Sequence, residues 1–437
     1  MRAKQLGKTL NSKELNGLVH PLRFLDNYTN LLCLAMEYAT LAAISVPTIA
    51  FCELHASWGL HWGWCIPVVI AAIFLNGAVL HRIGGLGHEG SHYILMKNRY
   101  LNELISDLFC MFPLFATTEQ YRLIHLGHHE YTNDWERDPE LLNLGKTRMM
   151  DQFPMSRWEF IYHFYVRVLW PPALFRYLWD NIWVTALGKG VHPYPAAEGN
   201  RQPPTFAGFR ITSLLGVTHF AVMSALMGYL SLYGNAFLLI VVPIVGWLVA
   251  LGAILAIPEH MFFHSRLKPV YSPKITSAIR LGYYTAMNAA VCWPVYLTGH
   301  MWGIYVWLLW VIPLVVTFPY YMLLRDLYQH ANADDGKLTN SRVIYTDPIT
   351  RWAMFIYGQD AHLTHHLYPA VPHYNLQKLH RLLKEHNAEY AEHVVECHGT
   401  FWNRTGQLTL LDVIEKPTRE PEPDLAAELD MVGSGAR

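Results

Sequence analysis

Residues 211–265 read ITSLLGVTHFAVMSALMGYLSLYGNAFLLIVVPIVGWLVALGAILAIPEHMFFHS, a run of 55 residues without lysine or arginine. A helix that crosses a membrane needs about 20 apolar residues, so this run has room for two crossings and a short turn. Residues 24–81 and 281–324 also lack lysine and arginine, over 58 and 44 residues. The three runs therefore predict three hairpins of membrane helices.

Turn-forming residues divide each run near Glu53–His61, Tyr233–Asn235 and Gly299–His300. The expected helices are 30–52, 63–81, 211–232, 236–257, 279–298 and 301–323. All basic residues then lie on one side of the membrane, which the positive-inside rule assigns to the cytoplasm together with both termini. The sequence predicts an all-α, polytopic, multi-pass membrane bundle of about six helices in three hairpins, with a cytoplasmic histidine-rich cap.

Composition agrees with an integral membrane protein. Only 15% of the residues are charged, where soluble proteins have about 25%. The net charge of −1 gives no sign of a nucleic-acid partner. The six cysteines form no C-x-x-C pair, so we interpret them as reduced packing residues.

The remaining segments allow three predicted regions. Residues 1–23 form a cytoplasmic N-terminal segment, 24–385 the membrane domain with its metal-binding cap, and 386–437 a C-terminal cytoplasmic segment that is disordered from about 415. Two shorter stretches are expected at the membrane surface: 101–115, too short to cross, and 158–185, an amphipathic helix.

Three histidine clusters carry the chemistry: His88-Glu-Gly-Ser-His92, His125-Leu-Gly-His128-His129 and His362-Leu-Thr-His365-His366. Spacings of three and four place side chains on one face of a helix. Neutral imidazole is a ligand for iron, zinc, copper and nickel. Eight imidazoles are twice the number that one zinc ion takes, so we expect two metal ions. Spacing alone leaves iron and zinc both open.

The clusters resemble the H-x(3)-H, H-x(2)-H-H and H-x(2)-H-H boxes of the membrane fatty acid desaturase superfamily. The flanking sequences HHEYTNDWERDPE (128–140) and HLTHHLYPAVPHYNL (362–376) are also similar, as is RDLYQHANADDGKLTNSR (325–342). The likeness covers roughly residues 70–385. It implies two iron ions with dioxygen as co-substrate, a fatty acyl or lipid substrate, and His330 as a ninth ligand. The implied metal ligands are His88, His92, His125, His128, His129, His330, His362, His365 and His366.

The resemblance favours a desaturase, which introduces a double bond. A hydroxylase, a ketolase or a decarboxylase of the same superfamily is the alternative. No haem-domain motif is visible in the sequence, so we expect a separate electron donor, either a ferredoxin or a small haem cytochrome. H-E-x-x-H at 88–92 also matches an intramembrane zinc metalloprotease, and a metal transporter is a third class.

Other residues near the boxes have weaker patterns. Carboxylates that could orient the imidazoles are Glu89, Glu130, Asp134, Asp138, Asp326 and Asp360. His260 and His264 share the i, i+4 spacing but match none of the boxes. We expect His81 and His219 to be packing groups.

Overall fold

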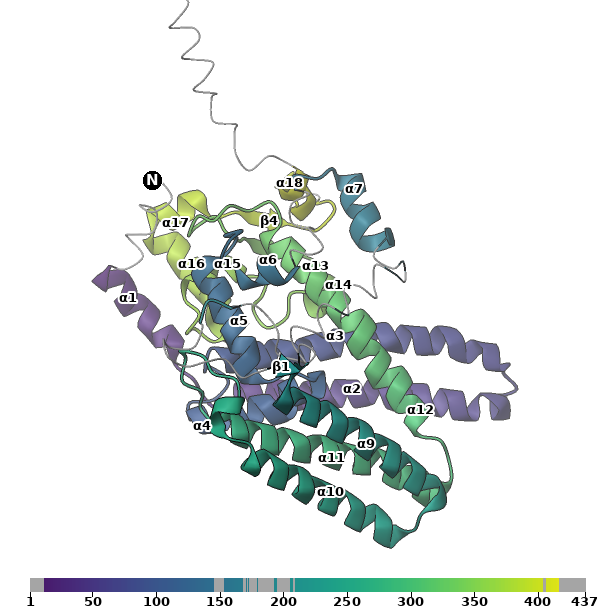
Figure 1. Ribbon diagram of the computed structural model, residues 1–437. Helices are drawn as coiled ribbons and strands as arrows, with labels where there is room; N and C mark the ends of the chain where they lie inside the picture. Colours follow the sequence, from purple (N-terminus) through teal and green to yellow (C-terminus); the bar gives the residue numbers. More distant parts are fainter. Residues whose placement is uncertain are drawn as a thin grey trace, which may run out of the picture.

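The computed structural model describes residues 12–144, 153–167, 170, 172, 179, 192–194, 205–206, 209–403 and 406–415. These residues are mostly helical, and Figure 1 shows two parts. Long apolar helices form one end of the molecule. Shorter helices, which lie within residues 13–19, 118–144, 157–161 and 348–415, form the other end, which we call the cap.

The long helices follow the three predicted hairpins. The first pairs α2 (Thr29–Leu54) with α3 (Cys65–Ser91), and the second pairs α9 (Ile211–Tyr233) with α10 (Ala236–Ala256). The third joins α11 (Pro273–Thr298) to α12 (Gly303–Val306), which continues through π-helical turns at Trp307–Val311 and Pro313–Thr317 into α13 (Phe318–His330). Each turn lies where the sequence predicts it.

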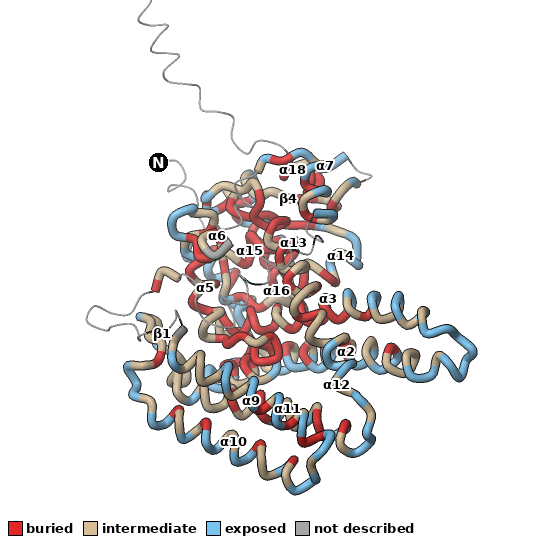
Figure 2. The backbone as a smooth tube through the Cα atoms, turned by 45° about the vertical axis from the view of Figure 1, so that its right-hand side comes forward, coloured by how far each residue is buried: buried red, intermediate tan, exposed pale blue. Residues whose placement is uncertain are grey.

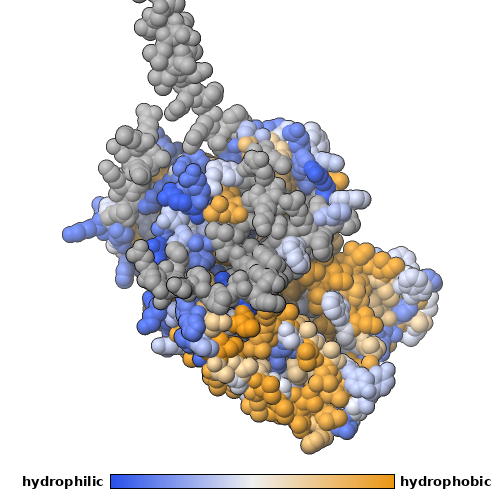
Figure 3. All heavy atoms as spheres, viewed as in Figure 1, coloured by the Kyte–Doolittle hydropathy of each residue, from blue (hydrophilic) through white to orange (hydrophobic). Residues whose placement is uncertain are grey.

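Five of these helical segments are long and apolar enough to cross a membrane: Thr29–Trp58, Trp62–Ser91, Ile211–Tyr233, Ala236–Ala256 and Gly303–His330. Their surfaces form the hydrophobic end of the molecule in Figure 3. The helix α11 is absent from this set because polar residues such as Tyr283, Tyr284 and Asn288 interrupt its apolar sequence. It packs against both α9 and α10. The predicted count of six crossings stays a prediction.

Helix α3 is longer than the membrane requires. Its 27 residues span about 40 Å at 1.5 Å per residue, against a hydrocarbon core of about 30 Å. The C-terminal turns therefore extend into the cap and carry the first histidine box. Close packing there needs a glycine: a Cβ on Gly90 would lie 2.7 Å from the Cβ of Ser106 on α4 (Arg99–Ser106).

The one acidic residue inside the first predicted crossing, Glu37, faces the protein interior. Its carboxylate accepts hydrogen bonds from Arg82 of α3 at 2.8–2.9 Å, and the Tyr357 hydroxyl donates to the same oxygen. The charge is thus paired across the α2–α3 interface, as burial in an apolar setting requires.

The cap packs on the C-terminal ends of α3 and α13. Its helices are α1 (Lys13–Val19), α5 (Thr118–Tyr131), α6 (Pro139–Leu144), α7 (Arg157–Ile161), α14 (Pro348–Ala353), α15 (His362–Leu367), α16 (His373–His386), α17 (Ala388–His393) and α18 (Leu410–Glu415). Strand β3 (Val343–Tyr345) lies parallel to β4 (Glu396–His398), and β1 (Thr205–Phe206) lies antiparallel to β2 (Phe209–Arg210). Figure 2 shows that burial concentrates where the cap helices meet α3.

The structure describes parts of the two segments that were predicted to lie at the membrane surface. Residues 101–115 form the end of α4, a π-helical turn (Asp107–Met111) and a 3₁₀ turn (Phe112–Leu114), and they are not among the segments long and apolar enough to cross a membrane. Of 158–185, the structure describes α7 and a π-helical turn at Tyr162–Val166; most of the rest lies outside the described residues. The predicted disordered tail also lies outside them.

Replacing Glu37 by Ala should lower the free energy of unfolding by about 3 kcal/mol, because it leaves the half-buried Arg82 guanidinium without its counter-ion. Thermal unfolding of the purified protein in detergent measures the effect. The neighbouring Met36 is 65% exposed, so Met36→Ala is the control. Equal melting temperatures for the two variants would contradict the pairing, whereas Glu37→Leu combined with Arg82→Leu should restore much of the lost stability.

Candidate metal centre

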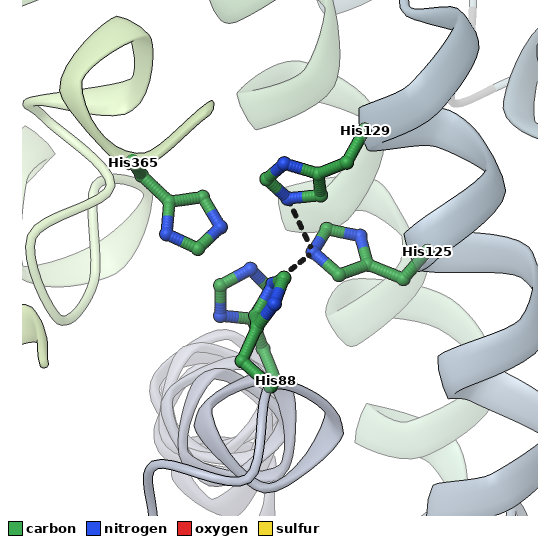
Figure 4. Close-up of side chains that lie close together, drawn as sticks. His88, His125, His129 and His365 are labelled. Carbon is green, nitrogen blue, oxygen red and sulfur yellow. Dashed lines mark hydrogen bonds between the residues drawn. The ribbon is translucent and has the colours of Figure 1, made fainter. Parts of the chain in front are cut away.

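The nine predicted histidines lie together in two groups. The five-histidine group comprises His88, His92, His125, His129 and His365, and the four-histidine group comprises His128, His330, His362 and His366. Within each group one nitrogen per ring lies within 4.8 Å of all the others. Figure 4 shows His88, His125, His129 and His365 pointing toward one another from three helices, α3, α5 and α15. The groups adjoin, since the ring centroids of His129 and His366 are 4.2 Å apart.

Each H-x(2)-H-H box contributes to both groups. On α5, His125 and His129 enter the five-histidine group, whereas His128 enters the four-histidine group. Residues four apart share a helix face, but adjacent residues point about 100° apart. The third box does the reverse from α15: His365 enters the five-histidine group, and the i, i+4 pair of His362 and His366 enters the other. The paired histidines thus distribute ligands between two neighbouring sites.

The nitrogen spacing fits metal coordination. His125 Nε2 lies 2.9 Å from His92 Nε2 and 3.0 Å from His129 Nε2. In the four-histidine group, His362 Nε2 lies 2.9 Å from His330 Nε2 and 3.1 Å from His366 Nε2. Two imidazole nitrogens bound at about 2.1 Å to one ion, at a right angle, would be about 3.0 Å apart.

Several ring nitrogens have no other partner. His365 is fully buried, and neither of its nitrogens makes a hydrogen bond to any residue that the structure describes. An unpaired buried polar atom costs about 1–3 kcal/mol, which a bound metal ion removes. Burial, reinforced by the neighbouring imidazoles, holds the pKa of His92, His129, His365 and His366 well below the ordinary value. The rings are therefore neutral, as metal ligands must be.

Asp138 orients His128. Its carboxylate is fully buried and lies 3.0–3.1 Å from His128 Nδ1, so the Nδ1–H donates and Nε2 is left for a metal. Backbone N–H groups of Asn133 and Glu140 donate to the same carboxylate at 2.9 Å. Burial lowers the pKa of His128, but Glu140 and Asp138 outweigh it and raise the pKa to about 9. Carboxylates that favour a proton here also favour a metal cation.

Two further contacts fix ring orientation in the four-histidine group. His330 Nδ1–H donates to the Asn340 carbonyl at 3.0 Å, and Asn133 donates to the same carbonyl at 2.9 Å. The Thr132 hydroxyl donates to the carbonyl of His128 and accepts from His366 Nδ1–H at 3.1 Å. Sequence reasoning missed Asn340 and Thr132. Thr132, four residues after His128, has the spacing of a hydroxyl that bonds back to the helix, but Asn340 has no such signal.

Arg122 on α5 anchors the second box to the first. Its guanidinium donates to the carbonyls of Ser91 (2.8 Å) and Gly90 (3.1 Å) at the end of α3. It also forms a buried ion pair with Glu103 at 2.6 Å. The unpaired carbonyls at a helix C-terminus need such donors. The pair therefore holds His125 in register with His88.

The other candidates lie outside the two groups. Asp134 forms a surface ion pair with Arg137, and Asp360 pairs with Arg351. His81 Nδ1–H donates to the Ala353 carbonyl at 2.9 Å, which agrees with its predicted packing role. His264 contacts the Glu259 carbonyl on a 3₁₀ turn and lies outside both groups, as does His260.

Comparison with known proteins adds an independent observation. A family model described as "Fatty acid desaturase" matches residues 60–275 and 262–400. Dihydrorhizobitoxine desaturase of Bradyrhizobium elkanii is 30% identical over 178 residues, 39% of this chain and 45% of that protein. An sn-1 oleoyl-lipid 12-desaturase of Anabaena variabilis is 34% identical over 87 residues, 18% of this chain and 24% of that protein. The chain therefore spans less than half the length of either relative.

Replacing Asp138 by Asn should lower the metal affinity of the purified protein by about 10- to 100-fold, because His128 loses the carboxylate that orients its ring. Titration of the metal-depleted protein, followed by elemental analysis, measures the change. Asp134→Asn alters the same loop at the surface and is the matched control. Unchanged affinity in Asp138→Asn would refute the orienting role.

Proposed function

The chain belongs to the fatty acid desaturase family, and from this membership we propose that it is a membrane diiron oxidoreductase that introduces a double bond into a fatty acyl or lipid chain. The family membership, predicted from the histidine boxes, is confirmed. Desaturation removes one hydrogen from each of two neighbouring carbons. Dioxygen accepts these two hydrogens, together with two electrons and two protons, and is thereby reduced to two molecules of water.

The observation that carries the proposal is the pair of adjoining histidine groups with five and four converging nitrogens. Bound iron would supply the dioxygen-dependent oxidation of a C–H bond, which no amino-acid side chain can perform. The protein holds imidazoles in two neighbouring sets and orients His128 through Asp138. Burial of six of the nine rings would help to keep bulk water from the reacting carbon.

Sister reactions use the same ligand set. A hydroxylase, a ketolase or a decarboxylase would need the same two histidine groups, and the relatives named above are all desaturases, which favours desaturation. The zinc protease interpretation needs Glu89 as a free general base. The Glu89 carboxylate is buried and accepts the backbone N–H of His373 at 3.0 Å, which counts against that role.

The proposal extends to location and electron supply. The cap and both termini would face the cytoplasm, because the lysines and arginines lie at that end of the predicted crossings. A separate protein, a ferredoxin or a small haem cytochrome, would deliver the two electrons from the cytoplasmic side.

Replacing His128 or His365 by Ala should remove iron from the purified protein and abolish product, since each ring belongs to a different histidine group. Elemental analysis and mass spectrometry of total lipids from an expressing host measure the two effects together. Desaturation appears as the loss of two hydrogens, and hydroxylation as the gain of one oxygen. His264→Ala is the control outside both groups. Full activity with iron retained in His128→Ala and His365→Ala would refute the assignment.

The orientation can be tested with single cysteines in a cysteine-free background. Ser57 lies in the exposed turn between α2 and α3, and Glu385 is exposed near the end of α16. A membrane-impermeant maleimide should label Ser57→Cys in intact cells and Glu385→Cys only after permeabilisation. The reverse pattern would place the cap on the other side.

A further inference from the structure

A cavity of about 200 Å³ lies between α9 and α11 at the ends that face the cap, beside the beginning of α5. Its apolar wall is a cluster of three aromatic rings, Phe115, Phe220 and Tyr284, with centroids 5.0–5.6 Å apart. Typical small-molecule pockets are about 300–1,000 Å³. The cavity therefore fits the head and first carbons of a long molecule, not a whole acyl chain.

The cavity also holds a positive charge, which lies next to two of these aromatic residues. Arg280 of α11 lines it, and this guanidinium donates to the Phe115 carbonyl at 2.6 Å and to the Tyr284 hydroxyl at 3.4 Å. No carboxylate in the described part of the chain forms an ion pair with Arg280. The charge of Arg280 acts on Asp107 only at a distance, because the Asp107 carboxylate accepts a hydrogen bond from the backbone N–H of Thr118 and forms no ion pair with Arg280. A half-buried guanidinium bonded only to neutral oxygens favours an anionic partner.

A second polar group in the same cavity lacks a partner. The Oε1 atom of Gln120 is buried and makes no hydrogen bond within the described residues. Buried amide groups are normally satisfied, and unpaired ones point to a missing partner. Arg280 donates, so it suits an anionic oxygen, whereas Gln120 Oε1 accepts, so it suits a hydroxyl or a protonated oxygen of the same head.

The cavity also lies close to the metal centre and to the edge of the apolar surface. Tyr121, the residue after Gln120, stacks on His125 of the five-histidine group, with ring centroids 5.3 Å apart. Helix α9 begins at Ile211, and its exposed side chains include Ile211, Val217 and Val222, which are apolar. An amphiphile at this level would place its head at the cap and its chain toward the membrane helices.

We propose that this cavity binds the anionic head of an amphiphilic substrate, with Arg280 as the residue that selects for negative charge. The head is a carboxylate or a phosphate, and the first carbons of the chain lie against Phe220 and Tyr284. The identification of the ligand as substrate rests on the proposed function, whereas binding itself does not require turnover.

Binding to the full-length purified protein in detergent tests the inference. The probe is a spin-labelled stearate, displaced by oleate, by oleoyl lysophosphatidic acid or by uncharged oleyl alcohol. Oleate or the lysophospholipid should displace the probe at a concentration at least about ten-fold lower than the alcohol, and the better of the two identifies the head as carboxylate or phosphate. No preference for either anion over the alcohol would overturn the proposal.

Arg280→Gln should weaken binding of the preferred anion at least about ten-fold and leave the alcohol unchanged, whereas Arg280→Lys should retain most of the affinity. Lys274→Gln removes one charge from the same helix without touching the cavity and is the matched control. Unchanged anion affinity in Arg280→Gln would overturn the charge-selecting role.

A second variant guards against loss of folding. Gly216 lines the cavity, and a Cβ added to it would have no other atom within 4 Å, so Gly216→Phe can fill the space without a clash at Cβ. It should weaken binding of anions and alcohol alike, and unimpaired binding would place the ligand elsewhere.

If anions bind as expected but no desaturated product forms in the lipid assay, the proposed function fails and this site stands. If product forms while Arg280→Gln binds normally, this inference alone fails.

Discussion

The structure depends on one constraint: nine imidazoles, six of them buried, must keep their lone pairs directed at two neighbouring points. Burial keeps most of the rings neutral, and several nitrogens then have no hydrogen-bond partner among the described residues. Such an arrangement is unfavourable by about 1–3 kcal/mol for each unpaired atom unless a cation occupies the space between the rings. The long α3, the Arg122 anchor and the Asp138 carboxylate all serve to hold this arrangement in place.

The hairpins could be predicted from the sequence because their cause is local and general. A lysine or arginine in the hydrocarbon core is costly, so its absence over 44 to 58 residues marks paired crossings with their turns. Glu37 is a charged residue inside the first run, but its charge is neutralised by Arg82 of the neighbouring helix. The eight box histidines could also be predicted from the sequence, because their spacing of three and four residues is a local pattern. His330 could not, because a lone histidine has no period, and only the resemblance to a family identified it.

The supporting residues depend on tertiary structure that spacing does not contain. Asp134 and Asp138 lie four residues apart in one loop, and both were candidates to orient a ring. Only the fold decides between them: Asp138 turns inward to His128, and Asp134 turns outward to Arg137. The Asn340 carbonyl reaches His330 because the loop after α13 folds back on the loop after α5. No sequence pattern connects these two loops.

Helix α3 joins the bilayer to the metal centre as one continuous rod, because beyond its first turn it contains neither proline nor a π-helical turn. A helix that is too long for its bilayer tilts, and a helix that is too short pulls its ends inward. Since the first histidine box lies on the last turns of α3, hydrophobic mismatch would move these imidazoles relative to those on α5 and α15. The lipid composition of the host membrane therefore acts directly on ligand geometry, and thickness-matched lipids are the natural environment in which to assemble the site.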